Sequence, residues 1–332
     1  MSPSAWRDRP VFITGVTGFV GSALAARLVG AGARVVGLVR EEDLPHSTLA
    51  CLGIDRRITM VRGSLEDGPL LARAVAEHAI EVVYHLGAQA IVGVATESPR
   101  ATFTANIAGT WNVLEACRGH APLRAVIVAS SDKAYGTHPT LPYREEFPLQ
   151  PHYPYDVSKA CAELIARSYW FTYQLPVVIT RFANLYGPGD LNFSRIVPDA
   201  IRHVLQGTPP VIRSDGTPER DYLYIDDAID LYLLLAERIQ EIRGEAFNAG
   251  PNAPLSVRAL VELILRLAGR TDLTPQVLGR GTPHGEIDRQ CLDGRKARER
   301  LGWTPRISLE DGVQRALAWY ADYLHHAAPT GR

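Results

Sequence analysis

The sequence has no excess of charge of either sign. It carries 35 Lys and Arg residues against 36 Asp and Glu residues, which gives a formal net charge of −1. A general nucleic-acid binder or a membrane-surface binder would show a basic excess. We therefore expect no nucleic-acid or membrane partner, and we expect any anionic ligand to be met by a local group of arginines.

Long hydrophobic runs are also absent. No stretch reaches the roughly 18 apolar residues of a membrane span, and the polar start MSPSAWRDRP lacks the apolar segment of a signal peptide. The wide spacing of the cysteines, with no C-x-x-C pair, favours reduced thiols over disulfides or a metal site. These cysteines are Cys51, Cys117, Cys161 and Cys291. We expect a cytoplasmic protein without a bound metal.

The first half of the chain alternates short apolar runs with amphipathic stretches. Strands are predicted at 10–14, 34–39, 82–86, 125–129 and 177–181. Helices are predicted at 19–29, 101–117 and 155–173. This alternation is typical of an α/β fold with a doubly wound parallel sheet, and continuous Val/Ile runs suit strands that are covered on both faces.

The pattern changes after about residue 185, where Pro and Gly become frequent. Helices are predicted there at 196–205, 226–239, 256–267 and 309–324. We expect a Rossmann-type domain over 1–185 and a smaller ligand-binding lobe over 186–332. The boundary is soft, because the strand at 177–181 belongs to the sheet, and we leave open that the chain recrosses it.

A glycine-rich loop follows the first strand and opens the first helix. It reads Gly15-Val16-Thr17-Gly18-Phe19-Val20-Gly21. The G-x-x-G-x-x-G spacing lets the backbone approach a pyrophosphate, and the helix N-terminus supplies free N–H groups. A glycine pattern alone is weak, but here it stands between a strand and a helix as the mechanism requires. The loop predicts that the first domain binds a dinucleotide.

The choice of dinucleotide depends on the residues after the second strand. An acidic residue there would hold a ribose 2′-hydroxyl and favour NAD, but Arg40 occupies the position. Arg40 paired with a 2′-phosphate would favour NADP, whereas Glu41 or Glu42 on the ribose would favour NAD. We expect NAD, with NADP left open and a solvated Arg40 as the alternative.

Two segments in the first domain carry polar side chains suited to catalysis. Tyr155 and Lys159 are four residues apart at the start of a predicted helix, so phenol and ammonium share one helical face. The ammonium should lower the tyrosine pKa from about 10 and let the phenol take a proton as hydride leaves the same carbon. The strand at 125–129 runs into Ser131, Asp132 and Lys133 at the sheet edge where such folds bind ligands.

These residues together resemble the extended short-chain dehydrogenase/reductase superfamily, and within it the nucleotide-sugar epimerases and dehydratases. The matching segments are GVTGFVG at 15–21, YHLGAQA at 84–90, NIAGTWNVLEA at 106–116, SSDKAYG at 130–136, PYDVSK at 154–159, RFANLYGPGD at 181–190, RDYLYIDD at 220–227 and LGW at 301–303. The Asp-Lys pair after Ser131 is most similar to the CDP-glucose 4,6-dehydratase-like branch.

The resemblance implies a set of binding residues and a homodimer. Besides the glycine loop and Arg40, it implies cofactor contacts at Leu65, Leu86, Ala88, Asn106, Tyr155 and Lys159. For the nucleotide-diphosphate sugar it implies Asn184, Arg195, Arg213, Arg220 and Arg289. It also implies that the helices at 101–117 and 155–173 pack against a second subunit. One departure is the run Pro283-His284-Gly285-Glu286, which lacks an arginine that many epimerases have there.

The resemblance also implies a reaction, a 4,6-dehydration that leaves a 4-keto-6-deoxy sugar nucleotide. Tyr155 would take the 4-hydroxyl proton, Lys133 the C5 proton, and Asp132 would protonate the leaving 6-hydroxyl. Lys133 would need a pKa lowered from about 10.4 to roughly 7–8. The residues alone favour a turn cap for Asp132 and a solvated Lys133. A 4-epimerase and a non-catalytic cofactor-sensing protein are the alternatives.

Overall fold

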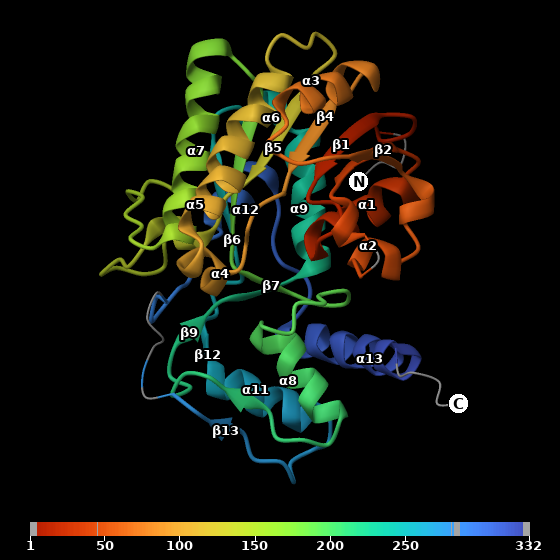
Figure 1. Ribbon diagram of the computed structural model, residues 1–332. Coiled ribbons are helices and arrows are strands. Elements are labelled where there is room, and N and C mark those ends of the chain that lie inside the picture. Colours follow the sequence, from red (N-terminus) through yellow and green to blue (C-terminus); the bar gives the residue numbers. More distant parts are fainter. Residues whose placement is uncertain (1–4, 45, 280, 282–285, 328–332) are drawn as a thin grey trace.

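A parallel sheet forms the centre of the computed structural model, which describes residues 5–44, 46–279, 281 and 286–327 (Figure 1). Within this part of the chain the sheet has seven strands in the order β11-β6-β5-β4-β1-β2-β3, and every neighbouring pair is parallel. The strands are β1 (Pro10–Thr14), β2 (Arg34–Val39), β3 (Thr59–Arg62), β4 (Val82–His85), β5 (Ala125–Ala129), β6 (Val177–Phe182) and β11 (Ala246–Ala249). The predicted doubly wound α/β fold is confirmed.

Helices cover both faces of this sheet, which explains why its central strands are apolar along their whole length. In β1, Val11 and Ile13 pack into one core while Phe12 packs into the other. The first core is covered by α1 (Phe19–Gly30) and α9 (Ile225–Glu237). The second is covered by α3 (Gly68–Glu77), α6 (Gly109–Cys117) and α7 (Pro154–Tyr173), which lie side by side in Figure 1.

The chain leaves the sheet after β6, forms most of a smaller lobe and then returns. The lobe lies below the sheet in Figure 1 and contains α8 (Ile196–Leu205), α11 (Val257–Leu267) and α13 (Leu309–Ala327). Its short paired strands are β7 (Asn184–Tyr186) with β10 (Tyr222–Tyr224), β9 (Glu219–Arg220) with β12 (Leu255–Ser256), and β8 (Val211–Ile212) with β13 (Gln276–Val277). β11 is an edge strand of the sheet and α9 covers one of its faces, although both elements lie after residue 185.

Three of the predicted strands match the structure at both ends, and the predicted helix at 101–117 is divided. It consists of α5 (Pro99–Phe103), a π-helical turn (Thr104–Ala108) and α6. β3 and α3 were not predicted from the sequence, and neither was β11, whose Asn248 interrupts an apolar pattern. The remaining helices are α2 (Thr48–Cys51), α4 (Val92–Glu97), α10 (Ile239–Ile242) and α12 (Arg295–Leu301).

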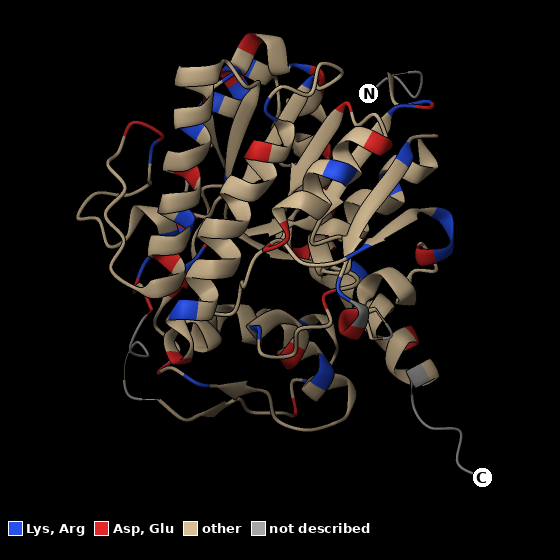
Figure 2. Ribbon diagram, turned by 45° about the horizontal axis from the view of Figure 1, so that its top comes forward, with Lys and Arg blue, Asp and Glu red and all other residues tan. Residues whose placement is uncertain are grey.

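Charged residues are spread over the fold without a region of one sign in the view of Figure 2. This distribution agrees with the net charge of −1. Among the described residues, no helix has the length and apolarity that a membrane crossing requires.

Candidate active site

The glycine loop between β1 and α1 is shaped by two close backbone contacts. Gly15 has φ +70°, and a Cβ on it would lie 2.7 Å from the backbone nitrogen of Gly87. A Cβ on Gly21 would lie 2.2 Å from the carbonyl oxygen of Gly15. Gly18 is different, because it is exposed and its Cβ would meet only that carbonyl, at 3.4 Å. Gly15 and Gly21 therefore close the turn, while Gly18 leaves the backbone open to a ligand, as a pyrophosphate requires.

A buried histidine connects the ends of β1 and β4 beneath this loop. The ring nitrogens of His85 lie 2.8 Å from the Thr14 hydroxyl and 2.9 Å from the Thr110 hydroxyl. Thr14 also accepts a hydrogen bond from the Gly87 backbone at 3.0 Å. Burial, assisted by Lys159, lowers the pKa of His85 to about 3, so the ring is neutral and positions the loop without adding charge.

The other predicted cofactor residues differ in exposure. Phe19 is buried in the core, and the half-buried ones are Thr17, Val20, Leu65, Leu86 and Ala88. Arg40, directly after β2, is exposed, and its Nε donates to Asp43 at 2.8 Å. Its guanidinium is therefore engaged by a carboxylate of its own loop.

Asn106 lies in the π-helical turn, a form of helix that often marks functional sites. Its side-chain nitrogen donates to the Gln89 carbonyl at 3.0 Å and to the Ser158 hydroxyl at 2.8 Å, and its oxygen accepts from the Gln89 backbone at 2.6 Å. The side chain thus connects the loop after β4 to α7, one residue from Lys159.

Tyr155 and Lys159 lie in the first turns of α7, which begins with Pro154 at its first position. Lys159 donates from Nζ to the Ala129 carbonyl at 2.9 Å, at the end of β5. Burial lowers the pKa of Lys159 to about 8. Burial also raises the pKa of Tyr155 to about 12, against a hydrogen bond from Ser131 that lowers it. The expected lowering of this pKa by Lys159 is therefore wrong for the protein alone, because desolvation of the phenol dominates.

Ser131, Asp132 and Lys133 follow β5 and enter a short 3-10 turn, η5 (Asp132–Tyr135). The Ser131 hydroxyl donates to Asp132 Oδ1 at 3.0 Å and accepts from the Lys133 backbone at 3.2 Å. Lys133 is buried rather than solvated, contrary to what composition alone favoured. Asp132 is also buried, and the residue that caps the turn is Ser131 rather than Asp132. Burial raises the pKa of Asp132, although Lys133 and Ser131 oppose the shift, and this favours a carboxyl that carries a proton.

A buried ion pair holds η5 and α7 in one arrangement. Arg181 of β6 pairs with Glu163 of α7 and donates to the Tyr135 hydroxyl of η5. Tyr135 in turn donates to Asn248 of β11 at 2.8 Å. The positions of Ser131 and Tyr155 relative to each other are therefore fixed by contacts among β6, β11, η5 and α7.

The structure also places Glu286 in the candidate site. From the sequence, this residue stood out only as the last of the run 283–286, which lacks the arginine that many epimerases have there. Its Oε2 accepts from Lys133 Nζ at 2.6 Å and from Arg220 Nη2 at 3.2 Å. Burial alone would raise the pKa of Glu286, but the two cations lower it. No local sequence pattern indicated this contact, because Glu286 and Lys133 are 153 residues apart in the chain.

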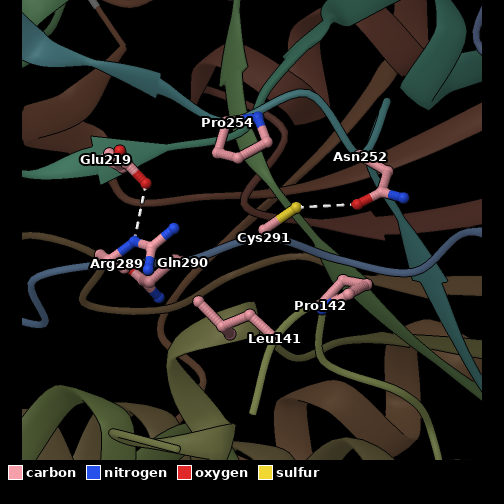
Figure 3. Close-up of a pocket in the computed structure, with 8 residues that line it drawn as sticks. All are labelled: Leu141, Pro142, Glu219, Asn252, Pro254, Arg289, Gln290 and Cys291. Carbon is pink, nitrogen blue, oxygen red and sulfur yellow. Dashed lines mark hydrogen bonds and ion pairs between the residues drawn. The ribbon is translucent and has the colours of Figure 1, made fainter. Parts of the chain in front are cut away.

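Of the four predicted substrate arginines, only Arg220 is brought to this cluster by an ion pair. Arg195 pairs with Asp190 at 3.1 Å, and Arg213 pairs with Asp199 at 3.4 Å. Arg289 is 65% exposed and pairs with Glu219 at 2.7 Å, in a pocket of about 180 Å³ that Cys291 and Asn252 also line (Figure 3). Within the described residues, His, Cys, Asp and Glu side chains form no group of three suited to a metal ion.

Asn184 is the remaining predicted substrate residue, and it lies on β7 beside Tyr222 of β10 in the strand register. The Asn184 amide nitrogen and the Tyr222 hydroxyl are buried polar atoms without a hydrogen-bond partner among the described residues. Such atoms are costly unless a ligand or water satisfies them, which is consistent with ligand binding at Asn184.

Asp156, next to Tyr155, is a second acid that the sequence analysis did not identify. It is fully buried, and neither carboxylate oxygen has a hydrogen-bond partner among the described residues. Burial raises the pKa of Asp156 to about 7, against the attraction of Lys133. The folded chain therefore binds this proton more tightly than the unfolded chain, where the pKa is about 4.

We expect Asp156→Asn to stabilise the protein in alkaline solution. A raised folded-state pKa gives stability that is full below the unfolded pKa and is lost as pH rises through about 7. The advantage of the Asn variant over wild type should thus be larger at pH 8 than at pH 5 by about 2–3 kcal/mol. Urea unfolding at both pH values measures it, with Asp322→Asn on the exposed face of α13 as control. An equal advantage at both pH values would contradict the shift.

Comparison with known proteins gives likenesses over almost the whole chain. Residues 12–316 match the family model described as GDP-mannose 4,6 dehydratase. A UDP-glucose 4-epimerase of Mycolicibacterium smegmatis is 30% identical over 316 residues, which cover 93% of this chain and 97% of that protein. A CDP-glucose 4,6-dehydratase of Salmonella typhimurium is 29% identical over 334 residues, which cover 96% and 92%.

A solved structure agrees with these relatives. The UDP-glucuronic acid 4-epimerase of Bacillus cereus, determined in complex with UDP-glucuronic acid and NAD, superposes with a TM-score of 0.85 at 27% identity. The match covers 95% of this chain and 99% of that chain.

Proposed function

The chain belongs to the GDP-mannose 4,6-dehydratase family, and from this we propose the reaction that it catalyses. The resemblance that the sequence analysis stated is thereby confirmed. Relatives of both reaction types match the chain at about 30% identity, so the family supports a nucleotide-sugar 4,6-dehydratase or a 4-epimerase. The proposed reaction is the dehydration, to a 4-keto-6-deoxy sugar nucleotide.

The observation that carries the proposal is the buried Asp132–Lys133 pair beside Ser131. An elimination across C5 and C6 needs an acid for the leaving hydroxyl and a base for the C5 proton, and a 4-epimerase needs neither. Burial supplies Asp132 with a raised pKa, which suits a carboxyl that donates a proton. Lysine, unlike arginine, can lose its proton and act as a base.

The presence of lysine rather than arginine at position 133 supports a role as a base, because lysine is rare in this chain. Of its 35 basic residues only three are lysines, namely Lys133, Lys159 and Lys296. Two of these three belong to the candidate site, where a titratable ammonium has a chemical use. Elsewhere the chain meets carboxylates mostly with arginine, with Lys296 paired to Glu245 at 3.0 Å as an exception, so a merely structural cation at 133 would more often be arginine.

We propose NAD as the cofactor, held by the glycine loop. Gly18 leaves the backbone open to a pyrophosphate, and the Arg40 guanidinium is already paired with Asp43 rather than committed to a 2′-phosphate. The Bacillus cereus neighbour was determined with NAD. When bound, NAD supplies a hydride acceptor for C4 and returns the hydride to C6.

The side chains would then move three protons. Tyr155 takes the proton of the substrate 4-hydroxyl, and the resulting 4-ketone acidifies the C5 hydrogen. Lys133 takes the C5 proton while Asp132 protonates the 6-hydroxyl, which leaves as water. Lys133 finally returns one of its three ammonium hydrogens to C5, and because ammonium hydrogens exchange with solvent, this is mostly a solvent hydrogen.

Ser131 can carry the proton that these reaction steps leave on Tyr155 back to Asp132. Over one cycle Tyr155 gains the 4-hydroxyl proton and Asp132 loses one to the departing water, so a proton must pass from the phenol to the carboxylate. The Ser131 hydroxyl donates to Asp132 at 3.0 Å and lowers the Tyr155 pKa by hydrogen bonding. It is therefore the group that links the two.

For the substrate we propose a nucleotide-diphosphate sugar bound in the lobe. Arg220 is the first candidate for the diphosphate, since arginine suits phosphate oxygens and this one is buried beside Lys133. Asn184 follows because its amide nitrogen lacks a partner. Arg195, Arg213 and Arg289 are weaker candidates, because each is more exposed than Arg220 and pairs with a carboxylate other than Glu286.

The alternative 4-epimerase would keep Tyr155 and use Asp132 and Lys133 for recognition only. A panel of nucleotide sugars incubated with the protein and NAD, followed by mass spectrometry, separates the two. Loss of one water supports the dehydratase, and an isomer of unchanged mass supports the epimerase. A non-catalytic protein would leave every sugar unchanged, although the intact Ser131, Tyr155 and Lys159 argue against it.

We further propose a homodimer through α6 and α7. Trp111 of α6 and Leu164 and Phe171 of α7 are large apolar side chains that are 45%, 57% and 67% exposed. Light scattering should give a dimer mass for the wild type at micromolar concentration and a monomer mass for the double variant Leu164→Asp, Phe171→Asp. Leu278→Asp, at 59% exposure in the lobe, is the matched control and should remain dimeric. A wild-type monomer would contradict the prediction.

A further inference from the structure

One carboxylate oxygen in the site faces two cations. Glu286 Oε2 lies 2.6 Å from Lys133 Nζ and 3.2 Å from Arg220 Nη2. The side chains of Lys133 and Arg220 are each only 11% exposed, so water screens the three charges poorly.

The arrangement presents a difficulty for the proposed base. An ion pair at this distance favours the charged form of both partners, here the Glu286 carboxylate and the Lys133 ammonium. An ammonium has no lone pair with which to take the C5 proton. Lys133 must therefore lose a proton before it can act.

The other charged groups around Lys133 do not remove that proton. They are Asp132 on its own turn, Asp156 on α7, and Arg220 on β9. Burial raises the pKa of both aspartates and so favours their protonated forms. Glu286 is different, because Lys133 and Arg220 lower its pKa, and it is the acceptor in direct contact with Nζ.

We propose that Glu286 couples substrate binding to activation of Lys133, by accepting the ammonium proton when the substrate diphosphate draws Arg220 away. The N–H bond at Lys133 Nζ breaks and an O–H bond forms at Glu286 Oε2, so the pair stays neutral overall. Loss of the Arg220 contact removes one of the two cations that stabilise the carboxylate, which raises its affinity for a proton. Glu286 is thus a positioning residue for the base, and the inference rests on the proposed dehydratase.

Proton transfer from Lys133 to Glu286 should make the rate of C5 proton removal depend on pH differently in wild type and in Glu286→Gln. If the proton moves only within the pair, activation involves no net uptake or release of a proton, so this step gives C5 proton removal by wild type no pH dependence, while the labile hydrogens of the pair still exchange with heavy water. In Glu286→Gln the amide cannot accept the proton, so the ammonium must lose it to solvent. The free-base fraction then rises about tenfold per pH unit below the lysine pKa.

The test is deuterium incorporation at C5 in heavy water, measured from pH 6 to 8 for wild type and Glu286→Gln. We expect the ratio of the variant rate to the wild-type rate to rise by about tenfold per pH unit. Taking the ratio cancels titrations that both proteins share, such as that of Lys159. The charge of Glu286 raises the pKa of Asp156, so the two proteins are also compared in an Asp156→Asn background. Glu286→Asp retains an acceptor and should give a ratio that is low but independent of pH.

Two other results of this deuterium experiment would contradict either the role of Glu286 or the dehydratase reaction on which it rests. A ratio for Glu286→Gln that is flat, or that falls as pH rises, overturns the role of Glu286, because the glutamate would then act only by its charge or its packing. Wild type that incorporates no deuterium at C5 overturns the dehydratase itself.

Discussion

Lys133→Ala protein given its substrate is expected to accumulate reduced cofactor, visible as absorbance of the dihydronicotinamide. Removal of Lys133 spares Tyr155, so oxidation at C4 proceeds, but the C5 proton has no acceptor, no water is eliminated, and the hydride cannot go on to C6. Overall turnover should fall by about 10²–10⁴-fold, the usual contribution of a general acid or base. Stopped-flow absorbance and product release measured together test the expectation.

Two variants serve as controls for this experiment. Tyr155→Phe removes the first base, so it should show neither reduced cofactor nor product. Lys296→Ala removes the lysine outside the site, which donates to the Ala246 carbonyl at 2.8 Å, and should turn over as wild type does. Product formation by Lys133→Ala at the wild-type rate would assign Lys133 to recognition and favour the epimerase.

Gly18→Val is expected to fold and to lose dinucleotide binding. A Cβ at Gly18 meets only the Gly15 carbonyl at 3.4 Å, and the residue is exposed, so the protein itself tolerates the side chain. The valine instead occupies the space that a pyrophosphate needs. Calorimetric titration with NAD should show at least about a 100-fold loss of affinity, or roughly 2.7 kcal/mol.

The matched control is Gly30→Val, at the end of α1, where an added Cβ would meet nothing within 4 Å. It carries the same substitution at the opposite end of α1 from Gly18, the N-cap of that helix, and should bind NAD as wild type does. Unchanged NAD affinity in Gly18→Val would show that the loop is a turn without a ligand.

Local patterns predicted the parts of the site that depend on neighbours in sequence. The glycine loop lies between β1 and α1 as expected, because its spacing is set by one strand, one turn and one helix. Tyr155 and Lys159 share α7 for the same reason, since positions four apart face the same way on a helix.

Contacts between distant segments could not be predicted in this way. The Lys133–Glu286 pair joins η5 to a segment 153 residues later, and no spacing rule relates the two. The direction of the Tyr155 pKa was wrong because a sequence gives the neighbouring Lys159 but not the desolvation of the phenol. β11 was missed because Asn248, a buried partner of Tyr135, makes a short strand look like a loop.

The dehydratase assignment depends most directly on the fate of the C5 hydrogen. Wild-type protein with NAD and its nucleotide sugar, in heavy water, is expected to release a product that has lost one water and carries deuterium at C5. In the epimerase, Lys133 touches no C5 proton and C5 keeps its original hydrogen. Turnover that leaves C5 free of deuterium would contradict the account.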